Sequence, residues 1–332
     1  MSRRAGETTR AVLERLRTAP GFLSGALLSA DLGLSRMAVC KAVAQLRLQG
    51  YLVEAIPHRG YRLTQDTDQP RASAVQPLLR TVALGRSWVF EPELSSTNRV
   101  AGELAAAGAP HGLVVSAEAQ TQGRGRLGRL WHSPPGRNLY LSVLLRPEVA
   151  AVRVPQVSLL TALAARRALA EVCPTLPVMV KWPNDLWVGP RKLGGILCEM
   201  DAELDRVRHV ILGVGLNVNL TAADLPADLV GRATSVRLEL GTPISRPRLL
   251  AAFLNALETL LDEWLKGDDL GPFVGELEDA SALAGRRLRV DLGVRSVEGT
   301  AVGIAPDGRL RLRQHDGGEL LVSSGEAHIL AL

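Results

Sequence analysis

The sequence has little of several residue types, and each shortage excludes a class of protein. Cys40, Cys173 and Cys198 are odd in number and widely separated, so the sequence favours neither a disulfide framework nor a cysteine zinc site. No apolar run approaches the roughly 20 residues of a membrane span, and the polar residues after Arg4 lack the apolar core of a signal peptide. We therefore expect a cytoplasmic protein that has no membrane partner.

Aromatic residues account for only 4% of the chain, whereas hydrophobic residues in total account for 46%, so aliphatic side chains must pack the cores. A chain of 332 residues suits two or three domains. The formal net charge of +5 is uneven: residues 1–65 hold 10 Lys and Arg against 4 Asp and Glu, and the remainder holds 29 against 30. This asymmetry favours nucleic acid as a partner of the first module, although a solvated basic face would have the same composition.

The first 65 residues have the element order of a winged helix-turn-helix. The spacing of apolar residues predicts helices over residues 8–18, 24–30 and 35–49, followed by strands over 51–54 and 60–63. In that fold the third helix enters the major groove of DNA and the hairpin lies against the backbone. The candidate DNA contacts lie on the third helix and at the hairpin tip: Ser35, Arg36, Lys41, Arg47 and Arg59. A winged helix that serves only for packing is the alternative.

The rest of the chain is predicted to form a linker and two further domains. Residues 66–80 contain two prolines and show no periodicity, which is typical of a linker. In 81–278, strand-like runs at 113–117, 139–145, 178–182, 195–200 and 209–215 accompany helices at 154–172 and 246–266. Because strands dominate, we expect an α+β domain rather than a doubly wound one. In 279–332, the alternating runs 287–292 and 310–313 predict a small β barrel of SH3-like size.

The segment Gly123 to Arg129 has the composition of an anion-binding loop. Its glycines let the main chain turn and approach a ligand closely. Arg124, Arg126 and Arg129 offer planar, permanently charged groups that suit carboxylate and phosphate oxygens. A flexible RNA-binding segment of the Arg-Gly-Gly type is the alternative, but such segments usually form longer repeats. The loop contains no Gly-Lys-Ser/Thr, so a P-loop kinase or ATPase is not indicated.

Lysine is scarce, because only four of the 39 basic residues are lysines. Two of the four, Lys181 and Lys192, lie close together, in Lys-Trp-Pro-Asn-Asp and Arg-Lys-Leu-Gly-Gly. We expect Lys181 to contact phosphate oxygens, Asp185 to lie near the Mg²⁺ that accompanies a nucleotide, and Lys192 to polarise a carboxylate. The simpler interpretation is a turn that ends a strand, in which Asn184 and Asp185 bond their own backbone.

At these residues the chain resembles a biotin protein ligase, in particular the bifunctional kind that is also the biotin operon repressor. The resemblance covers essentially the whole length, from the winged helix to the β tail. It rests on motifs that occur in this order: Ser95-Ser96-Thr97-Asn98, Gln120, the arginine-glycine loop, Lys181 to Asp185, Arg191 to Gly195, and Gly213 to Asn217. It implies a class II synthetase-like ligase domain between the two terminal domains.

The resemblance implies two half-reactions. Biotin and ATP form biotinyl-5′-AMP and pyrophosphate, and a lysine of the biotin carboxyl carrier protein of acetyl-CoA carboxylase then takes the biotinyl group. The residues implied for biotin are Ser96, Thr97, Asn98, Gln120, Arg124, Gly125, Arg126 and Lys192. Those implied for the nucleotide are Arg124, Arg126, Arg129, Trp131, Lys181 and Asn217, and those implied for catalysis are Arg126, Lys181 and Lys192. Biotinyl-AMP would also act as corepressor, favouring a homodimer on operator DNA.

Two positions depart from the family pattern. Leu127 stands where a further arginine is expected in the loop, and Glu326 to Leu332 lacks an arginine expected near the end. Two other functions stay open at this stage. One is a DNA-binding biotin sensor without turnover, against which the lysines and Asp185 argue. The other is a lipoate or octanoate transferase, against which the arginine-glycine loop argues.

Overall fold

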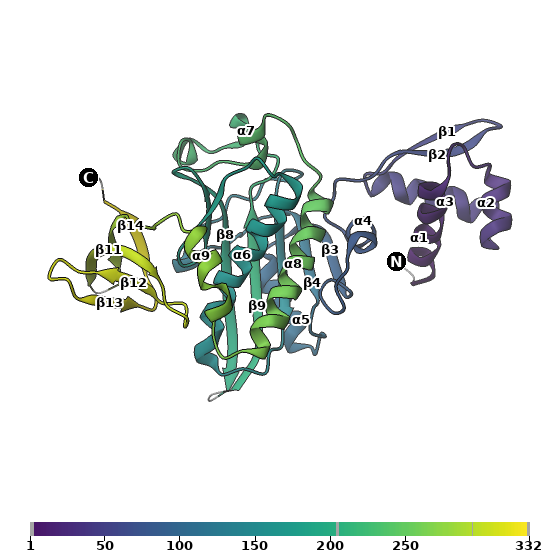
Figure 1. Ribbon diagram of the computed structural model, residues 1–332. Coiled ribbons are helices and arrows are strands. Elements are labelled where there is room, and N and C mark those ends of the chain that lie inside the picture. The colour runs from purple at the N-terminus through teal and green to yellow at the C-terminus, as the bar shows by residue number, and fades with distance from the viewer. Residues whose placement is uncertain (1–2, 204–205, 294, 331–332) are drawn as a thin grey trace. The chain divides into compact units, whose positions relative to one another are not determined.

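The computed structural model describes residues 3–203, 206–293 and 295–330, and it divides into two compact units, Met1–Gln69 and Pro70–Leu332. The smaller unit has the predicted winged helix-turn-helix order (Figure 1). Its elements are helices α1 (Arg3–Thr18), α2 (Gly25–Leu32) and α3 (Arg36–Leu48) and the antiparallel strands β1 (Leu52–Ile56) and β2 (Gly60–Gln65). Ser24 and Ser35 accept hydrogen bonds from the Leu27 and Ala38 amides, so α2 and α3 each begin with a side-chain N-cap.

The larger unit is built on a seven-stranded sheet. In spatial order its strands are β3 (Trp88–Leu94), β4 (Val114–Gln120), β5 (Leu139–Leu145), β9 (Arg206–Leu216), β8 (Arg191–Glu203), β7 (Asp185–Val188) and β6 (Val178–Lys181). Strands β3 and β4 are parallel, and the other neighbouring pairs are antiparallel. The predicted α+β class is confirmed, and the predicted strand 139–145 has the predicted bounds.

Helices cover both faces of this sheet. Helices α6 (Val154–Val172) and α8 (Arg246–Lys266) pack together over one face, where they bury residues such as Leu141 and Leu212 (Figure 1). Helix α5 (Thr97–Ala106) packs on the other face, against Leu144 and Ile211. Both long helices have the predicted bounds, whereas α5 and the strands β3 and β7 were not predicted.

A second antiparallel sheet follows in the same unit. Its five strands, in spatial order, are β13 (Glu319–Val322), β12 (Leu310–Arg313), β11 (Ser296–Ile304), β10 (Arg287–Asp291) and β14 (Glu326–Ile329). The predicted alternation is confirmed, since Leu288, Val290, Leu310 and Leu312 are buried. The buried indole of Trp182 donates to the Gly308 carbonyl at 3.0 Å, which joins this sheet to the turn after β6.

The expected linker over residues 66–80 is wrong for its second half. Residues Ala72–Val75 form a helix, α4, and Gln76–Leu78 form a 3-10 turn. Ala74 and Val75 are buried. The side-chain amide of Asn255, on α8, accepts a hydrogen bond from the Arg80 backbone N–H and donates one to the Leu78 backbone carbonyl. The segment is too short for a helical period to be recognised, and its order comes from contacts with α8.

Candidate active site

A cavity of about 500 Å³ opens beside the central strands of the larger sheet. Every residue predicted for biotin, nucleotide or metal lines it: Ser96, Thr97, Asn98, Gln120, Arg124, Gly125, Arg126, Arg129, Trp131, Lys181, Asp185, Lys192 and Asn217. These residues come from segments up to about 120 positions apart, so the fold brings together what the motifs only suggested. Their individual contacts with substrates stay predictions.

The first turn of α5 takes part in a network of polar side chains. The Thr97 amide donates to Gln120 Oε1 at 2.8 Å. The buried Ser142 hydroxyl lies within hydrogen-bonding distance of Thr97 Oγ1 at 2.8 Å and of Asn98 Oδ1 at 2.6 Å. Asn98 Nδ2 donates to Glu199 Oε2 at 2.7 Å. The network fixes the orientation of the predicted biotin residues.

Ser142 and Glu199 were not predicted as part of the site. Both lie inside strands, β5 and β8, and neither belongs to a motif, so only the fold reveals them. Gly213 of β9 adjoins the same network, because an added Cβ would collide with Asn98 Oδ1. The glycine therefore lets the Asn98 side chain lie against the strand.

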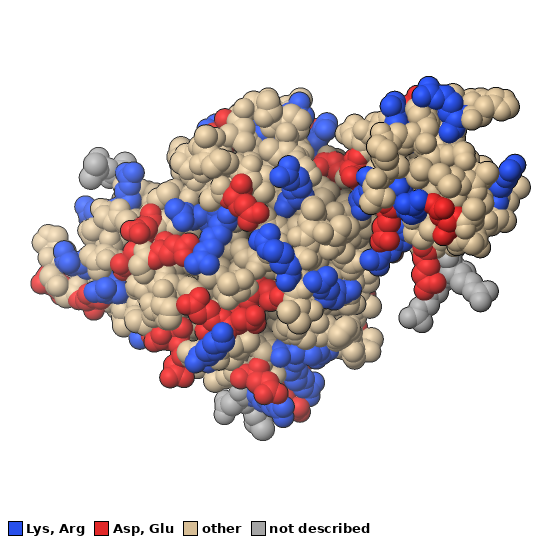
Figure 2. Space-filling view, turned by 45° about the vertical axis from the view of Figure 1, so that its right-hand side comes forward, with Lys and Arg blue, Asp and Glu red and all other residues tan. Residues whose placement is uncertain are grey.

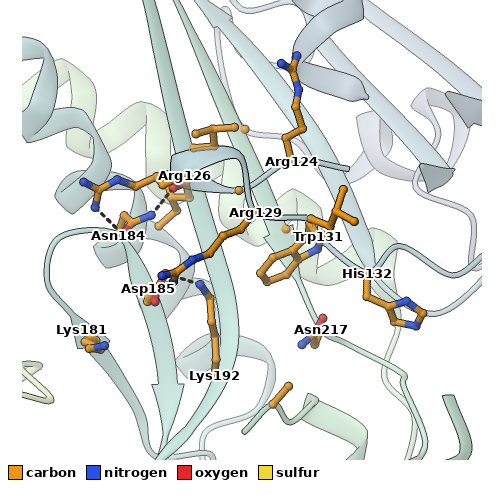
Figure 3. Close-up of a pocket in the computed structure, with 18 of the residues that line it drawn as sticks. Arg124, Arg126, Arg129, Trp131, His132, Lys181, Asn184, Asp185, Lys192 and Asn217 are labelled. Carbon is orange, nitrogen blue, oxygen red and sulfur yellow. Dashed lines mark hydrogen bonds and ion pairs between the residues drawn. The ribbon is translucent and has the colours of Figure 1, made fainter. Parts of the chain in front are cut away.

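The arginine-glycine loop is held by its own backbone and by a contact with Asn184. The Gly125 amide donates to the Arg129 carbonyl at 2.7 Å, and the Trp131 amide donates to the Gly123 carbonyl at 2.9 Å. Arg126 donates to Asn184 Oδ1 at 3.2 Å. Figure 3 shows Arg126 and Arg129 extending toward Asn184 and Asp185, whereas Arg124 extends in another direction.

Leu127 adopts a backbone conformation that favours glycine. Its φ is 57° and its side chain is 80% exposed. The position that lacks the expected arginine therefore carries an exposed apolar side chain at the edge of the cavity. The second departure, Glu326 to Leu332, extends beyond the described residues, which end at Leu330.

The two lysines lie against two tryptophans of the cavity. Lys181 Nζ is 4.5 Å from the centre of the Trp187 ring, and Lys192 Nζ is 5.4 Å from that of Trp131. Lys192 also forms an ion pair with Asp185 at 2.7 Å. Burial lowers the pKa of Lys181, and the neighbouring Asp185 carboxylate partly offsets this effect.

The simpler interpretation of Lys181 to Asp185 as a self-contained turn is wrong. Asn184 Nδ2 donates to the Ile196 carbonyl at 2.7 Å, on strand β8. Asp185 pairs with Lys192 rather than with its own backbone. Both side chains therefore connect β7 to elements that line the cavity.

Trp131 lies over two glycines of the sheet. An added Cβ on Gly215 would lie 2.6 Å from the indole, and one on Gly195 would lie 3.3 Å from it. The Trp131 Nε1 group is buried and has no hydrogen-bond partner within the described residues. Asn217 is committed to the protein, since its side chain bonds the Thr234 carbonyl and the Asn138 amide.

Carboxylates do not form a metal cage at this site. Within residues 3–203, 206–293 and 295–330, no group of three or more His, Cys, Asp and Glu could hold a metal ion. Asp185 is a single carboxylate that is already paired with Lys192. The residues therefore do not fit a resident Mg²⁺, and an ion could enter only on the phosphates of a nucleotide.

In the smaller unit, four of the basic side chains that the structure describes have no carboxylate partner. Arg10, Arg15, Arg17 and Arg62 pair with Glu14, Asp31, Asp66 and Glu54. In contrast, the predicted DNA contacts Arg36, Lys41, Arg47 and Arg59 are exposed and have no ion pair within the part of the chain that the structure describes. Figure 2 shows acidic side chains beside several basic ones on the visible face of this unit.

Two of these cations have neutral partners. Arg47 donates to the Val53 carbonyl at 3.0 and 2.8 Å, which connects α3 to β1. Arg59 lies over the Phe22 ring at 4.6 Å. Ser35 caps α3 with its hydroxyl, so this predicted DNA contact already has a structural role.

No described helix is long and apolar enough to cross a membrane.

A helix-turn-helix unit followed by a domain with a cation-lined cavity is the organisation expected of a DNA-binding module fused to an enzyme that acts on anionic substrates. Sequence models agree with each part: the HTH domain matches residues 8–62, the biotin/lipoate A/B protein ligase family matches 91–217, and the biotin protein ligase C terminal domain matches 284–329. The chain is 36% identical to the bifunctional ligase/repressor BirA of Bacillus subtilis (strain 168), over 89% of this chain and 90% of that protein.

Other relatives agree. Identity is 31% with the bifunctional ligase/repressor BirA of Escherichia coli (strain K12), over 92% of this chain and 94% of that protein. It is 35% with the biotin–[acetyl-CoA-carboxylase] ligase of Mycobacterium tuberculosis, over 79% and 97%. The solved biotin protein ligase from Aquifex aeolicus in complex with biotin and ATP is 28% identical, with a TM-score of 0.64, over 74% of this chain and 99% of that one.

The chain therefore belongs to the biotin protein ligase family and has the three-part organisation of its bifunctional ligase/repressor members. The family resemblance recognised in the sequence is confirmed.

Proposed function

We propose that this protein activates biotin with ATP, transfers the biotinyl group to a carrier-protein lysine, and represses biotin genes by binding operator DNA. One observation carries the enzymatic part. The arginine-glycine loop, Lys181, Lys192 and the Thr97–Gln120 network line a single cavity. Such a cavity can hold a neutral ring system at one end and a polyanion at the other.

The network at the first turn of α5 is suited to the ureido ring of biotin. Ser96, Thr97, Asn98 and Gln120 supply neutral donors and acceptors, and Ser96 makes no capping bond with its side chain. Arg124 and Gly125 lie in the same cavity and would close over the bound molecule. Neutral side chains of fixed orientation can hydrogen-bond to an uncharged ring without the free-energy cost of removing a charged group from water.

The cationic end is suited to the phosphates. A biotin carboxylate oxygen attacks the α-phosphorus of ATP, forming an acyl-phosphate bond as the bond to pyrophosphate breaks. Arg126, Arg129 and Lys181 stabilise the negative charge on the phosphoryl oxygens, and Lys192 contacts the biotin carboxylate. To contact the carboxylate, Lys192 must leave its ion pair with Asp185. Holding biotin and ATP side by side in one cavity supplies much of the rate enhancement.

The second half-reaction needs an amine and no further cofactor. The carrier lysine, as its free amine, attacks the acyl carbon, an amide bond forms, and AMP leaves as the amine loses a proton. Trp131, which lies over Gly215 and Gly195, borders the adenine together with Asn217. The carrier is the biotin carboxyl carrier protein of acetyl-CoA carboxylase. Mg²⁺ enters with ATP in this proposal.

The regulatory part rests on the smaller unit. Its unneutralised cations on α3 and at the hairpin tip suit the phosphates of operator DNA. Biotinyl-AMP acts as corepressor by favouring a homodimer that presents two such helices. The location in the proposal is the cytoplasm, which is consistent with Cys40, Cys173 and Cys198 being free thiols.

The test is a mass measurement. The protein is incubated with ATP, Mg²⁺, biotin and a biotin carrier domain, and the carrier should gain one biotinyl group while pyrophosphate is released. A carrier whose target lysine is replaced by arginine is the control. Pyrophosphate release without carrier modification would limit the protein to the adenylation of biotin. If no pyrophosphate is released, the protein is a DNA-binding biotin sensor without turnover. Octanoate that competes with biotin would favour the transferase alternative.

A further inference from the structure

The outer face of helix α3 is largely apolar. Met37 is 65% exposed and Leu48 is 76% exposed, and Cys40 and Ala44 are also exposed. These positions share one side of the helix because they recur at intervals of three, four and seven or more residues. The opposite side is the core side, where Val39, Ala42, Val43 and Leu46 are buried. We name the exposed residues Met37, Cys40, Ala44 and Leu48 the α3 stripe.

Cations without carboxylate partners border the α3 stripe. Arg36 and Lys41 lie beside it on the same helix, both exposed. Arg59, at the hairpin tip of the same unit, is a third cation without a carboxylate partner among the described residues, and it lies over the Phe22 ring. An apolar face that is bordered by unneutralised cations does not suit an apolar protein partner, which would bury those cations without partners. It suits a groove that has anionic rims and an apolar floor.

The major groove of DNA has this character where thymine occurs. Its rims are phosphates, and each thymine presents a C5-methyl group on the floor. Adenine is read by Asn or Gln side chains, and the α3 stripe contains no amide. Arg47 is an unsuitable base reader, because its guanidinium is bonded to the Val53 carbonyl.

We propose that the N-terminal half of the α3 stripe reads thymine methyl groups, so that the operator half-site is recognised mainly by apolar contact. Met37 and Cys40 carry this contact because they lie in the first turns of α3, and the N-terminal part of a recognition helix faces the bases. Leu48 is the last residue of α3 and lies away from the bases. This inference rests on the proposed operator binding and adds the chemistry of its specificity.

The experiment starts by finding the site. Full-length protein with biotin and ATP selects binding sequences from a random duplex pool. In the selected duplex, each thymine in turn is replaced by deoxyuridine, which removes only the methyl group. At two or more positions in each half-site, we expect the affinity to fall about three- to fivefold, the value for burying one methyl group.

Variants assign the effect to the α3 stripe. In Met37→Ala, at least one of those thymines should become equivalent to deoxyuridine, while the dependence of affinity on salt stays unchanged. Leu48→Ala is the matched control, an exposed apolar residue on the same face, and should keep the whole pattern. Lys41→Ala should weaken binding to all sequences and reduce the salt dependence. Transfer of biotin should be unchanged in all three variants.

Two results would overturn the inference. If deoxyuridine binds as well as thymine at every position while sequence selection succeeds, the protein binds operator DNA but does not read methyl groups. If Met37→Ala leaves the thymine preference intact at every position, the α3 stripe does not carry it. Failure to select any sequence would reject both the operator function and this inference, whereas the ligase assay above is independent of both.

Discussion

Arg129 in the arginine-glycine loop forms a bidentate ion pair with Glu326 at the start of β14, 197 positions away, with bonds of 2.6 and 2.5 Å. Arg126 of the same loop also approaches the Gly325 carbonyl at 3.5 Å. The C-terminal sheet therefore forms part of the wall of the cavity. The pair lowers the pKa of Glu326 and raises that of Arg129. If Arg129 binds a phosphate of ATP, as we propose, the Glu326 carboxylate competes with ATP for this guanidinium.

Glu326→Gln should lower the KM for ATP severalfold, because the neutral amide competes less for Arg129. The change in the free energy of unfolding should stay below about 1 kcal/mol, since Arg129 is largely exposed. Pyrophosphate release at varied ATP concentration measures the effect, and Arg129→Ala is the comparison, with a raised KM. A raised KM for ATP in both variants would mean that ATP binds to the intact Arg129–Glu326 pair and not to a released Arg129.

Lys181 should give the ligase an early alkaline limit. Burial lowers its pKa from 10.5, and Asp185, Lys192, Glu326 and Arg129 contribute smaller electrostatic effects. If the ammonium binds phosphate, pyrophosphate release should decline as pH rises through this lowered pKa. The rate is measured between pH 7 and about 10.5.

Lys181→Arg keeps its charge, so it should move the decline to higher pH. The free energy of unfolding should change with pH in the opposite direction to the rate. Between the lowered pKa of folded Lys181 and 10.5, the unfolded chain binds the Lys181 proton more tightly than the folded chain does, so the free energy of unfolding rises with pH in that window. An alkaline limit that is the same in Lys181→Arg would exclude Lys181 as its source.

Gly215→Ala should impair ATP binding without unfolding the protein. The added Cβ would lie 2.6 Å from the Trp131 indole, so the ring must move. We expect the KM for ATP to rise at least tenfold (about 1.4 kcal/mol) and the tryptophan fluorescence to change. Gly102→Ala, with nothing within 4 Å of its added Cβ, is the matched control. An unchanged KM would show that the nucleotide does not depend on the position of Trp131.

Arg246→Leu should destabilise the larger unit by about 3 kcal/mol. Arg246 and Glu118 form an ion pair at 3.2 Å with side chains only 3% and 10% exposed, so the change leaves a buried carboxylate unpaired. Denaturant unfolding followed by tryptophan fluorescence reports this unit, because all five tryptophans belong to it. Glu103→Ala removes the exposed Arg99–Glu103 pair and should cost less than about 0.5 kcal/mol. Equal losses in both variants would contradict the argument.

Local patterns predicted the elements that their own residues stabilise. Helices α6 and α8 have long apolar faces, and the hydroxyls of Ser24 and Ser35 satisfy amides within their own first turns. Strand β3 was missed because Pro92 interrupts it and its residues are only partly buried. Helix α5 was missed because alanine and glycine make much of its length, which leaves little apolar contrast.

The sequence by itself determined the family, the α+β class, and the chemical character of the site through its arginines, glycines and scarce lysines. Only the tertiary structure decided the partners: Asp185 with Lys192, Arg129 with Glu326, Ser142 with Asn98, and Arg47 with Val53. Helix caps and periodicity act over a few residues, so they are visible in the sequence. Contacts between distant segments depend on how the whole chain packs, and no local pattern specifies which oppositely charged residue will lie within reach.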